Sequence, residues 1–118
     1  MHHAIVYISW WYEEVGVIEQ IREKIQQRQY EYSRHAVDQS ILREISEVEM
    51  QEAIMNGEII EDYPNDKYGP SCLIAGQTPY QCWIHVQTSY PSRPKVKIIT
   101  LYQPNPDEWI DFKVRKPK

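Results

Sequence analysis

The spacing of the apolar residues changes at Asn56-Gly57, and this change constrains the fold more than any other feature. Before it, apolar residues such as Ile18, Ile21 and Ile25 recur at the three- and four-residue intervals of a helix. After it, the period falls to two, which is the period of a strand. Helices followed by strands predict an α+β fold, in which two or three N-terminal helices pack on one face of a four-stranded antiparallel sheet.

Three helical segments are expected before this change. The first begins at Val17. The second follows Ser33, a residue suited to cap a helix N-terminus, and it contains His35, Val37, Ile41 and Leu42. The third begins with the capping box Ser46-Glu47-Val48-Glu49. We expect Asn56-Gly57 to end it with a residue in the left-handed region.

Four strands are expected after Gly57, at residues 58–63, 71–76, 83–88 and 96–102. Turns rich in proline, asparagine and aspartate separate them. The remaining residues are expected to form a short C-terminal turn that contains Trp109 and Phe112.

The two cysteines lie on either side of the turn near Pro79. A hairpin register that pairs Ile74 with Ile84 would leave Cys72 and Cys82 too far apart for a disulfide. We therefore interpret both as core residues.

The whole chain is typical of one soluble domain. Its 118 residues are enough to bury a core, and its net charge of −4 argues against a broadly basic nucleic-acid binder but not against a local basic patch. Two cysteines and no visible secretory signal indicate a reduced, cytoplasmic protein. We expect residues 17–118 to form a single α+β domain and residues 1–16 an appendage.

The appendage carries an apolar block from Ala4 to Tyr12 without a clear period. The block is too short to span a bilayer, so no membrane association is expected. It could form an extra strand or helix, or an exposed segment through which the chain binds a partner or forms a homo-oligomer.

His35 is the first candidate for chemistry. Histidine titrates near neutral pH, so an imidazole placed near the start of a helix and facing a groove is suited to act as a general acid or base. The structural alternative is a ring that ties the helix to the sheet through hydrogen bonds.

No metal or other cofactor is expected. His85 shares a strand face with Trp83 and Gln87, where it could partner His35 or be a half-buried strand histidine. The cysteines and histidines lack the close ligand pair of a zinc site. Glu61, Asp62, Asp66 and Lys67 are similar to the acidic and lysine residues of a metal-dependent nuclease. Glu61 and Asp62 are expected to point to opposite faces of a strand, which favours a solvated edge followed by a turn.

Arg93, Lys95 and Lys97 form the best candidate for anion binding. The prolines at positions 91 and 94 stiffen the loop that carries Arg93, and the two lysines are expected on one strand face. The alternative is an edge strand that lysines protect against sheet-to-sheet pairing.

The assembled pattern closely resembles a bacterial domain-of-unknown-function family marked by an SxHA motif, over about residues 17–115. Cyanobacterial-looking members share the corner Tyr90-Pro91-Ser92-Arg93-Pro94. Many members carry an arginine four residues after the histidine, where this chain has Gln39. The other matching stretches are Tyr32–Ala36, Arg43, Ile45-Ser46, Glu49, Ala53–Pro64, Pro70–Leu73, Ile98–Thr100, Tyr102, Pro104 and Trp109.

The family layout is similar to RelE-like ribonuclease toxins, whose neighbours are often small antitoxins. The resemblance therefore implies RNA as substrate and an antitoxin protein as partner. It implies His35 as acid/base in a metal-independent cleavage and Arg93 and Lys95 as phosphate ligands, with Tyr102 or Thr100 orienting the phosphate. Lys97 and Tyr63 complete the predicted substrate-binding set.

The leading prediction is therefore an uncharacterised-family protein that acts as a toxin-like endoribonuclease. The first alternative is a non-catalytic interaction module that binds a partner or itself through the N-terminal block and a sheet edge. A metal nuclease is the third hypothesis.

Overall fold

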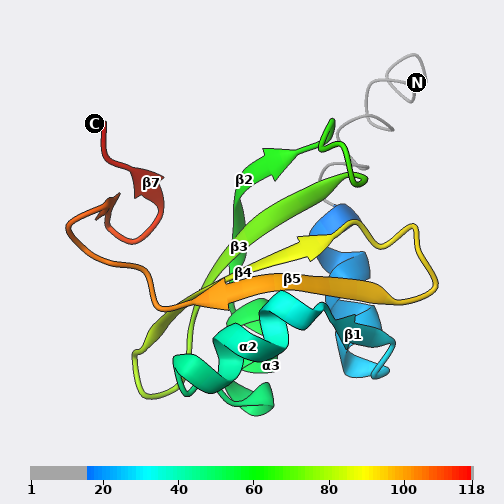
Figure 1. Ribbon diagram of the computed structural model, residues 1–118, viewed down its shortest axis with the longest axis horizontal. Coiled ribbons are helices and arrows are strands. Elements are labelled where there is room, and N and C mark those ends of the chain that lie inside the picture. Colours follow the sequence, from blue (N-terminus) through cyan, green and yellow to red (C-terminus); the bar gives the residue numbers. More distant parts are fainter. Residues whose placement is uncertain (1–15, 118) are drawn as a thin grey trace, which may run out of the picture.

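A computed structural model of the protein describes residues 16–117 (Figure 1). A helix at residues 16–26 comes first, and the predictions made for residues 1–15 lie outside the described residues. The elements that follow are β1 Tyr30–Tyr32, α2 Arg34–Leu42, α3 Glu47–Met55, β2 Glu58–Tyr63, β3 Ser71–Gln77, β4 Trp83–Ser89, β5 Val96–Tyr102, β6 Trp109–Ile110 and β7 Val114–Arg115. None of the described helices is long and apolar enough to cross a membrane.

The main sheet has five strands in the order β1-β5-β4-β3-β2. The four predicted strands form antiparallel pairs, but β1 adds to the outer side of β5 in parallel. The predicted four-stranded antiparallel sheet is therefore wrong, and the sheet is mixed. A three-residue strand is too short to show a period, and its partner lies far along the chain, so local sequence carries no signal for it.

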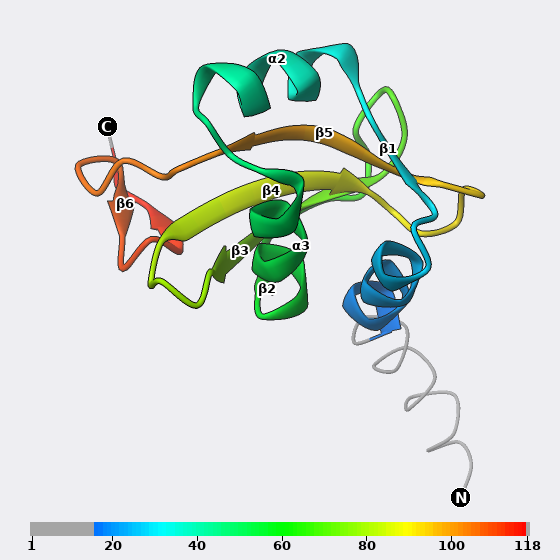
Figure 2. The same cartoon turned by 90° about the horizontal axis from the view of Figure 1, so that it is seen from below.

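The core lies between one face of the sheet and the helices. The helix at residues 16–26 contributes Ile21 and Ile25, and α3 contributes Met50, Ala53 and Ile54, all of them buried. Figure 2 shows α3 below β3 and β4, whereas α2 lies along β5 at the side of the sheet. Both predicted caps are confirmed: Ser33 Oγ accepts from the Ala36 amide, and Ser46 and Glu49 form the capping box.

The backbones of α3 and β3 approach each other closely. A Cβ on Gly76 would lie 1.8 Å from the Ala53 carbonyl oxygen, and a Cβ on Gly57 would lie 2.4 Å from the same oxygen. The left-handed stop predicted at Gly57 is wrong, because among the described glycines Gly69 has the positive φ. Position 57 requires glycine because a side chain there would overlap the neighbouring backbone.

The register of the β3–β4 hairpin is shifted by two residues from the prediction. Ile74 pairs with Val86, because the turn closes where the Thr78 amide donates to the Cys82 carbonyl. Both cysteines are free; Cys72 is buried, but Cys82 lies in the exposed turn, so its predicted place in the core is wrong. Burial raises the pKa of the Cys72 thiol to about 11.

The C-terminal residues form a hairpin rather than the predicted turn. Strands β6 and β7 pair with each other and cover part of the sheet face opposite the core. Phe112 stacks on Trp83 with ring centroids 5.4 Å apart, and Lys113 forms an ion pair of 2.6 Å with Glu58 on β2. Beyond this cover, Gln87, Lys97 and Thr100 are partly exposed on that face, whereas Ser71 and Ser89 are buried.

We predict that Gly76→Ala lowers the free energy of unfolding by about 3 kcal/mol, because the new methyl group would overlap the Ala53 carbonyl and force α3 off the sheet. Urea denaturation of the variant measures this loss. Gly16→Ala is the matched control, since its Cβ would meet nothing nearer than 3.5 Å and alanine favours a helix. Equal stability of the two variants would contradict the proposed packing.

Candidate functional site

The sheet face opposite the core is polar over its open part. Strand pairing aligns the outward residues in rows, which alternate with the buried core residues Ile74, Val86 and Leu101. We call this surface the polar face, and its members are Tyr63, Ser71, Gln87, Ser89, Lys97, Thr100 and Tyr102.

Four residues predicted to act on substrate lie on the polar face: Tyr63, Lys97, Thr100 and Tyr102. Tyr63 and Lys97 belong to one row, connected through Ser71 and Ser89, whose Oγ accepts from the Lys97 amide. Tyr102 lies two rows away, on the other side of Gln87 and Thr100. Rows are about 7 Å apart, so the face extends over about 14 Å from Lys97 to Tyr102.

A groove of about 260 Å³ opens at the Lys97 end of the polar face. Its walls come from the N-cap of α2, the β2–β3 loop and the loop before β5. The lining residues are Ser33, Asp66, Tyr68, Gly69, Ser89, Arg93, Lys97 and Ile99.

The three cations of the predicted anion site separate in the structure. Arg93 and Lys97 line the groove, whereas Lys95 is exposed and does not. Lys97 pairs with Glu31 at 3.2 Å, and Arg93 makes no side-chain hydrogen bond or ion pair within residues 16–117. The edge-protection alternative is wrong for Lys97, because β5 is flanked by both β1 and β4.

His35 is exposed on α2 and does not line the groove, although Ser33 at the start of the same helix does. Residues 35, 39 and 43 are spaced four apart and so share one side of the helix. Arg43 donates to Gln39 at 2.8 Å. Burial raises the pKa of Tyr102, and the positive charge of Arg115 opposes this effect.

The structural alternative for His35 is wrong. Its side chain is exposed and forms no hydrogen bond with any of residues 16–117, so it does not tie the helix to the sheet. Ser33 has that role: it donates from its hydroxyl to the Ile99 carbonyl at 2.8 Å while it caps the helix. The cap fixes the start of α2, and His35 is the second residue of the helix.

His85 is fully buried between Tyr102 and the C-terminal hairpin. Its Nε2 lies 2.6 Å from the Phe112 carbonyl, which can only accept, so Nε2 carries the proton. The neutral ring then accepts at Nδ1 from the Tyr102 hydroxyl, 3.2 Å away. The edge of Trp109 packs against the ring at 4.5 Å, and burial lowers the pKa of His85, which favours this neutral form.

Glu61, Tyr63 and Arg115 connect the polar face to the C-terminal hairpin. The Tyr63 hydroxyl donates to Glu61, and Arg115 donates to the same carboxylate at 2.9 Å. Burial, followed by the Glu61 hydrogen bond, raises the pKa of Tyr63 to about 12, so its hydroxyl remains a donor. The sequence did not indicate a role for Arg115, because no local pattern predicts that β7 lies against β2.

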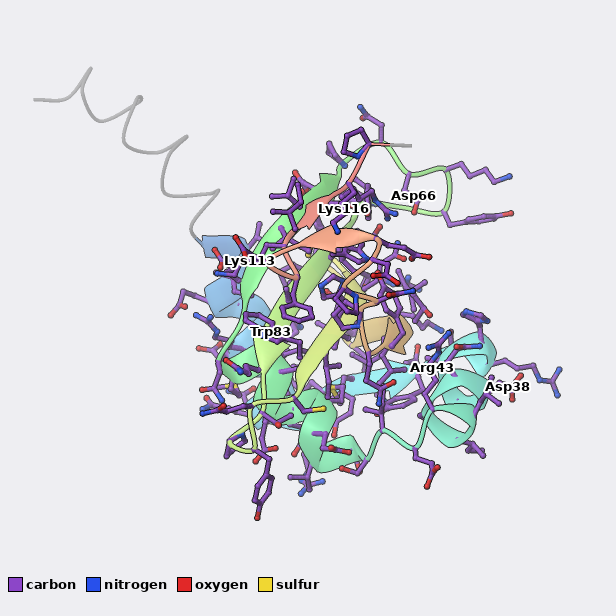
Figure 3. The ribbon with its side chains drawn as sticks, turned by 90° about the vertical axis from the view of Figure 1, so that its left-hand side faces the viewer. Asp38, Arg43, Asp66, Trp83, Lys113 and Lys116 are labelled. Atoms are coloured by element: carbon purple, nitrogen blue, oxygen red, sulfur yellow. The ribbon has the colours of Figure 1, made fainter. Side chains whose placement is uncertain are left out.

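Figure 3 labels residues of the elements that surround this sheet face. Lys113 and Trp83 lie together where the hairpin meets the sheet, with the ammonium 5.6 Å from the ring centroid. Asp66 marks the β2–β3 loop and Arg43 marks α2, two of the elements that border the open part of the face. The open surface is thus bounded by a helix, a loop and a hairpin.

The acidic residues do not assemble into a ligand set. Glu61 faces the hairpin, whereas Asp62 faces the other side of the sheet, where it accepts from the Tyr90 hydroxyl at 2.5 Å. Across residues 16–117, no three His, Cys, Asp or Glu side chains are grouped as metal ligands. The predicted opposition of Glu61 and Asp62 is confirmed.

These features define a mixed α+β domain with an open polar sheet face that can bind an anionic or hydrogen-bonding ligand. Residues 32–103, more than half of the chain, match the family described as Domain of unknown function (DUF4258), and the chain belongs to that family. The matched range contains Ser33-Arg34-His35-Ala36 and the whole polar face. No curated protein and no solved structure gives a significant match.

The buried His85 predicts a pH dependence of stability. The unfolded chain takes up a proton at this residue near pH 6.5, whereas the folded chain does so at lower pH. The free energy of unfolding therefore falls as the pH is lowered through 6.5 and levels off below the folded-state pKa.

Urea denaturation between pH 8 and pH 5 measures this effect. His85→Gln should remove this part of the pH dependence, and His35→Gln should retain it. A His85→Gln protein with the full wild-type pH dependence would show that the ring does not cause it.

Proposed function

We propose that the protein is a toxin-like endoribonuclease that works without a metal ion and uses His35 as its general base. The observation that carries the proposal is the exposed imidazole of His35, two residues after Ser33 in the chain. Ser33 lines the groove together with Arg93 and Lys97, which are predicted phosphate ligands.

The proposed reaction is an internal transfer at phosphorus. His35 takes the proton from a ribose 2′-hydroxyl, and the 2′-oxygen forms a bond to the adjacent phosphorus. The bond from phosphorus to the 5′-oxygen breaks, and this leaving oxygen takes a proton from water. The hydroxide that remains takes the proton from the His35 imidazolium, which restores the neutral base. The products are a 2′,3′-cyclic phosphate and a free 5′-hydroxyl.

Arg93 and Lys97 would stabilise the negative charge that develops on the phosphate oxygens. A guanidinium suits this task because it offers a planar pair of donors to a phosphate. Lys95, exposed before β5, would add charge along the approach of the RNA. Tyr63 lies in the same row as Lys97, and because its hydroxyl donates to Glu61, we assign it a positioning role in the binding set.

We assign the orientation of the phosphate to Thr100 and a positioning role to Tyr102. The Tyr102 hydroxyl donates to His85, so its proton is already engaged. Thr100 lies in the next row of the polar face, and its side chain is partly exposed. Arg43, held by Gln39, provides a cation on the same side of α2 as His35.

We expect His35→Ala to reduce the cleavage of single-stranded RNA at least about 100-fold, because it removes the general base. Asp38→Ala is the control, since Asp38 is an exposed residue of the same helix. Gel assays of cleavage with 10-minute and overnight incubation would be run with and without about 5 mM EDTA, and we expect chelation to have no effect.

Circular dichroism and thermal unfolding verify that both variants fold. Cleavage by His35→Ala at the wild-type rate would end the acid/base proposal. Loss of cleavage on chelation would favour the metal nuclease instead, and a wild-type protein that cleaves no RNA would overturn the proposed activity.

The second candidate is a non-catalytic interaction module, and one observation favours it. Four large apolar side chains on α2 and α3 are exposed: Val37, Ile41, Leu42 and Val48. Ile41 and Leu42 are exposed by 72% and 73%, which is unusual for adjacent aliphatic residues at the end of a helix.

If this surface joins two copies of the chain, Ile41→Asp combined with Leu42→Asp should convert a dimer to a monomer. Sedimentation velocity at about 10 to 100 μM measures the change. A wild-type protein that is monomeric throughout this range would contradict self-association.

A further inference from the structure

Tyr68 stands beside the groove with its ring almost entirely in solvent. Its side chain is 82% exposed, and it lines both the groove and an adjoining hollow of about 270 Å³. The backbone around it is held by Asp66, which accepts from the Tyr68 amide at 3.3 Å and, through its carbonyl, from the Gly69 amide at 2.9 Å. An exposed aromatic ring on this hydrogen-bonded loop, beside a polar groove, is a surface on which a nucleobase can stack.

Asp66 provides the polar recognition in the same groove. Its carboxylate is fixed by the Ser71 hydroxyl at 3.2 Å. An ionised carboxylate can only accept hydrogen bonds, so it selects a base with adjacent donors. Guanine presents N1–H and its exocyclic amine side by side, whereas adenine, cytosine and uracil each place an acceptor beside their donor.

Arg93 provides the charge for a phosphate. Its side chain has no partner within residues 16–117, and it lines both hollows beside Tyr68. Its loop is fixed, because Lys24 donates to the carbonyls of Arg93 and Pro94 at 2.9 and 3.1 Å. The guanidinium is therefore presented from an anchored loop and is free to bind an anion.

We propose that this groove is a subsite for one guanine nucleotide. Tyr68 stacks on the base, Asp66 accepts from its N1–H and amine, and Arg93 binds its phosphate. Each hollow is close in volume to the smallest ligand pockets, which fits a single nucleotide. The place of this subsite within a cleaved RNA rests on the proposed function, and the subsite would direct cleavage to a position beside guanine.

Isothermal titration of the full chain with 5′-GMP, 5′-AMP, 5′-CMP and 5′-UMP tests the subsite without any cleavage step. We expect 5′-GMP to bind about tenfold more tightly than the others. Asp66→Asn should remove this preference, because asparagine presents both a donor and an acceptor. Arg93→Ala should weaken all four nucleotides alike and reduce the salt dependence of binding by about one ion.

Tyr68→Ala should weaken all four nucleotides, and Tyr68→Phe should restore their binding, since phenylalanine keeps the stacking surface. Tyr80→Ala is the matched control, because Tyr80 is 94% exposed in the β3–β4 turn, which does not line the groove. Equal affinity of the wild type for all four nucleotides would overturn the proposal, as would an unchanged preference in Asp66→Asn.

Different results would overturn the ribonuclease proposal and the guanine-subsite proposal. Binding of 5′-GMP by a wild-type protein that cleaves no RNA would overturn the ribonuclease and support the subsite. Cleavage of RNA with no preference for guanine, together with equal nucleotide binding, would overturn the subsite and leave the ribonuclease.

Discussion

The contact of the Ala53 carbonyl with the backbone of β3 determines how the two layers of the protein are placed. Glycine at positions 57 and 76 allows this approach, and no larger residue could replace either without moving α3. The helix at residues 16–26 reinforces it, because Arg22 donates to the carbonyls of Ile54 and Gly57 at the end of α3. With the core closed on this side, the opposite sheet face remains for the C-terminal hairpin and for the polar face.

The two ends of that opposite face differ in burial. At one end, the hairpin buries His85 beneath Trp109 and uses both ring nitrogens. At the other end, the groove keeps Arg93 free, and His35 is exposed on the adjoining helix. Burial thus separates His35, the first candidate in the sequence, from His85, its possible partner, and His85 acts by holding Tyr102.

The elements with strong local patterns could be predicted from the sequence. The caps at Ser33 and Ser46 and the four longer strands are confirmed because each depends on residues next to one another. Strand β1 was missed because its partner β5 lies far along the chain, whereas β6 and β7 pair locally but are only two residues long, too short to show a period. Arg93 was a candidate from its stiff corner, whereas Tyr68, and Asp66 as a ligand for something other than a metal, became candidates only when the fold placed their loop at the same groove.

The hydrogen bond from Ser33 to the Ile99 carbonyl spans 66 residues, and β1 pairs with β5 over a similar distance. Contacts so far apart in sequence cost more loop-closure entropy than local contacts. During synthesis on a ribosome, α2 cannot pack against β5 until β5 has emerged. A nascent chain would thus carry His35 before Arg93 and Lys97 have been added, and the groove would remain incomplete until most of the domain had been made.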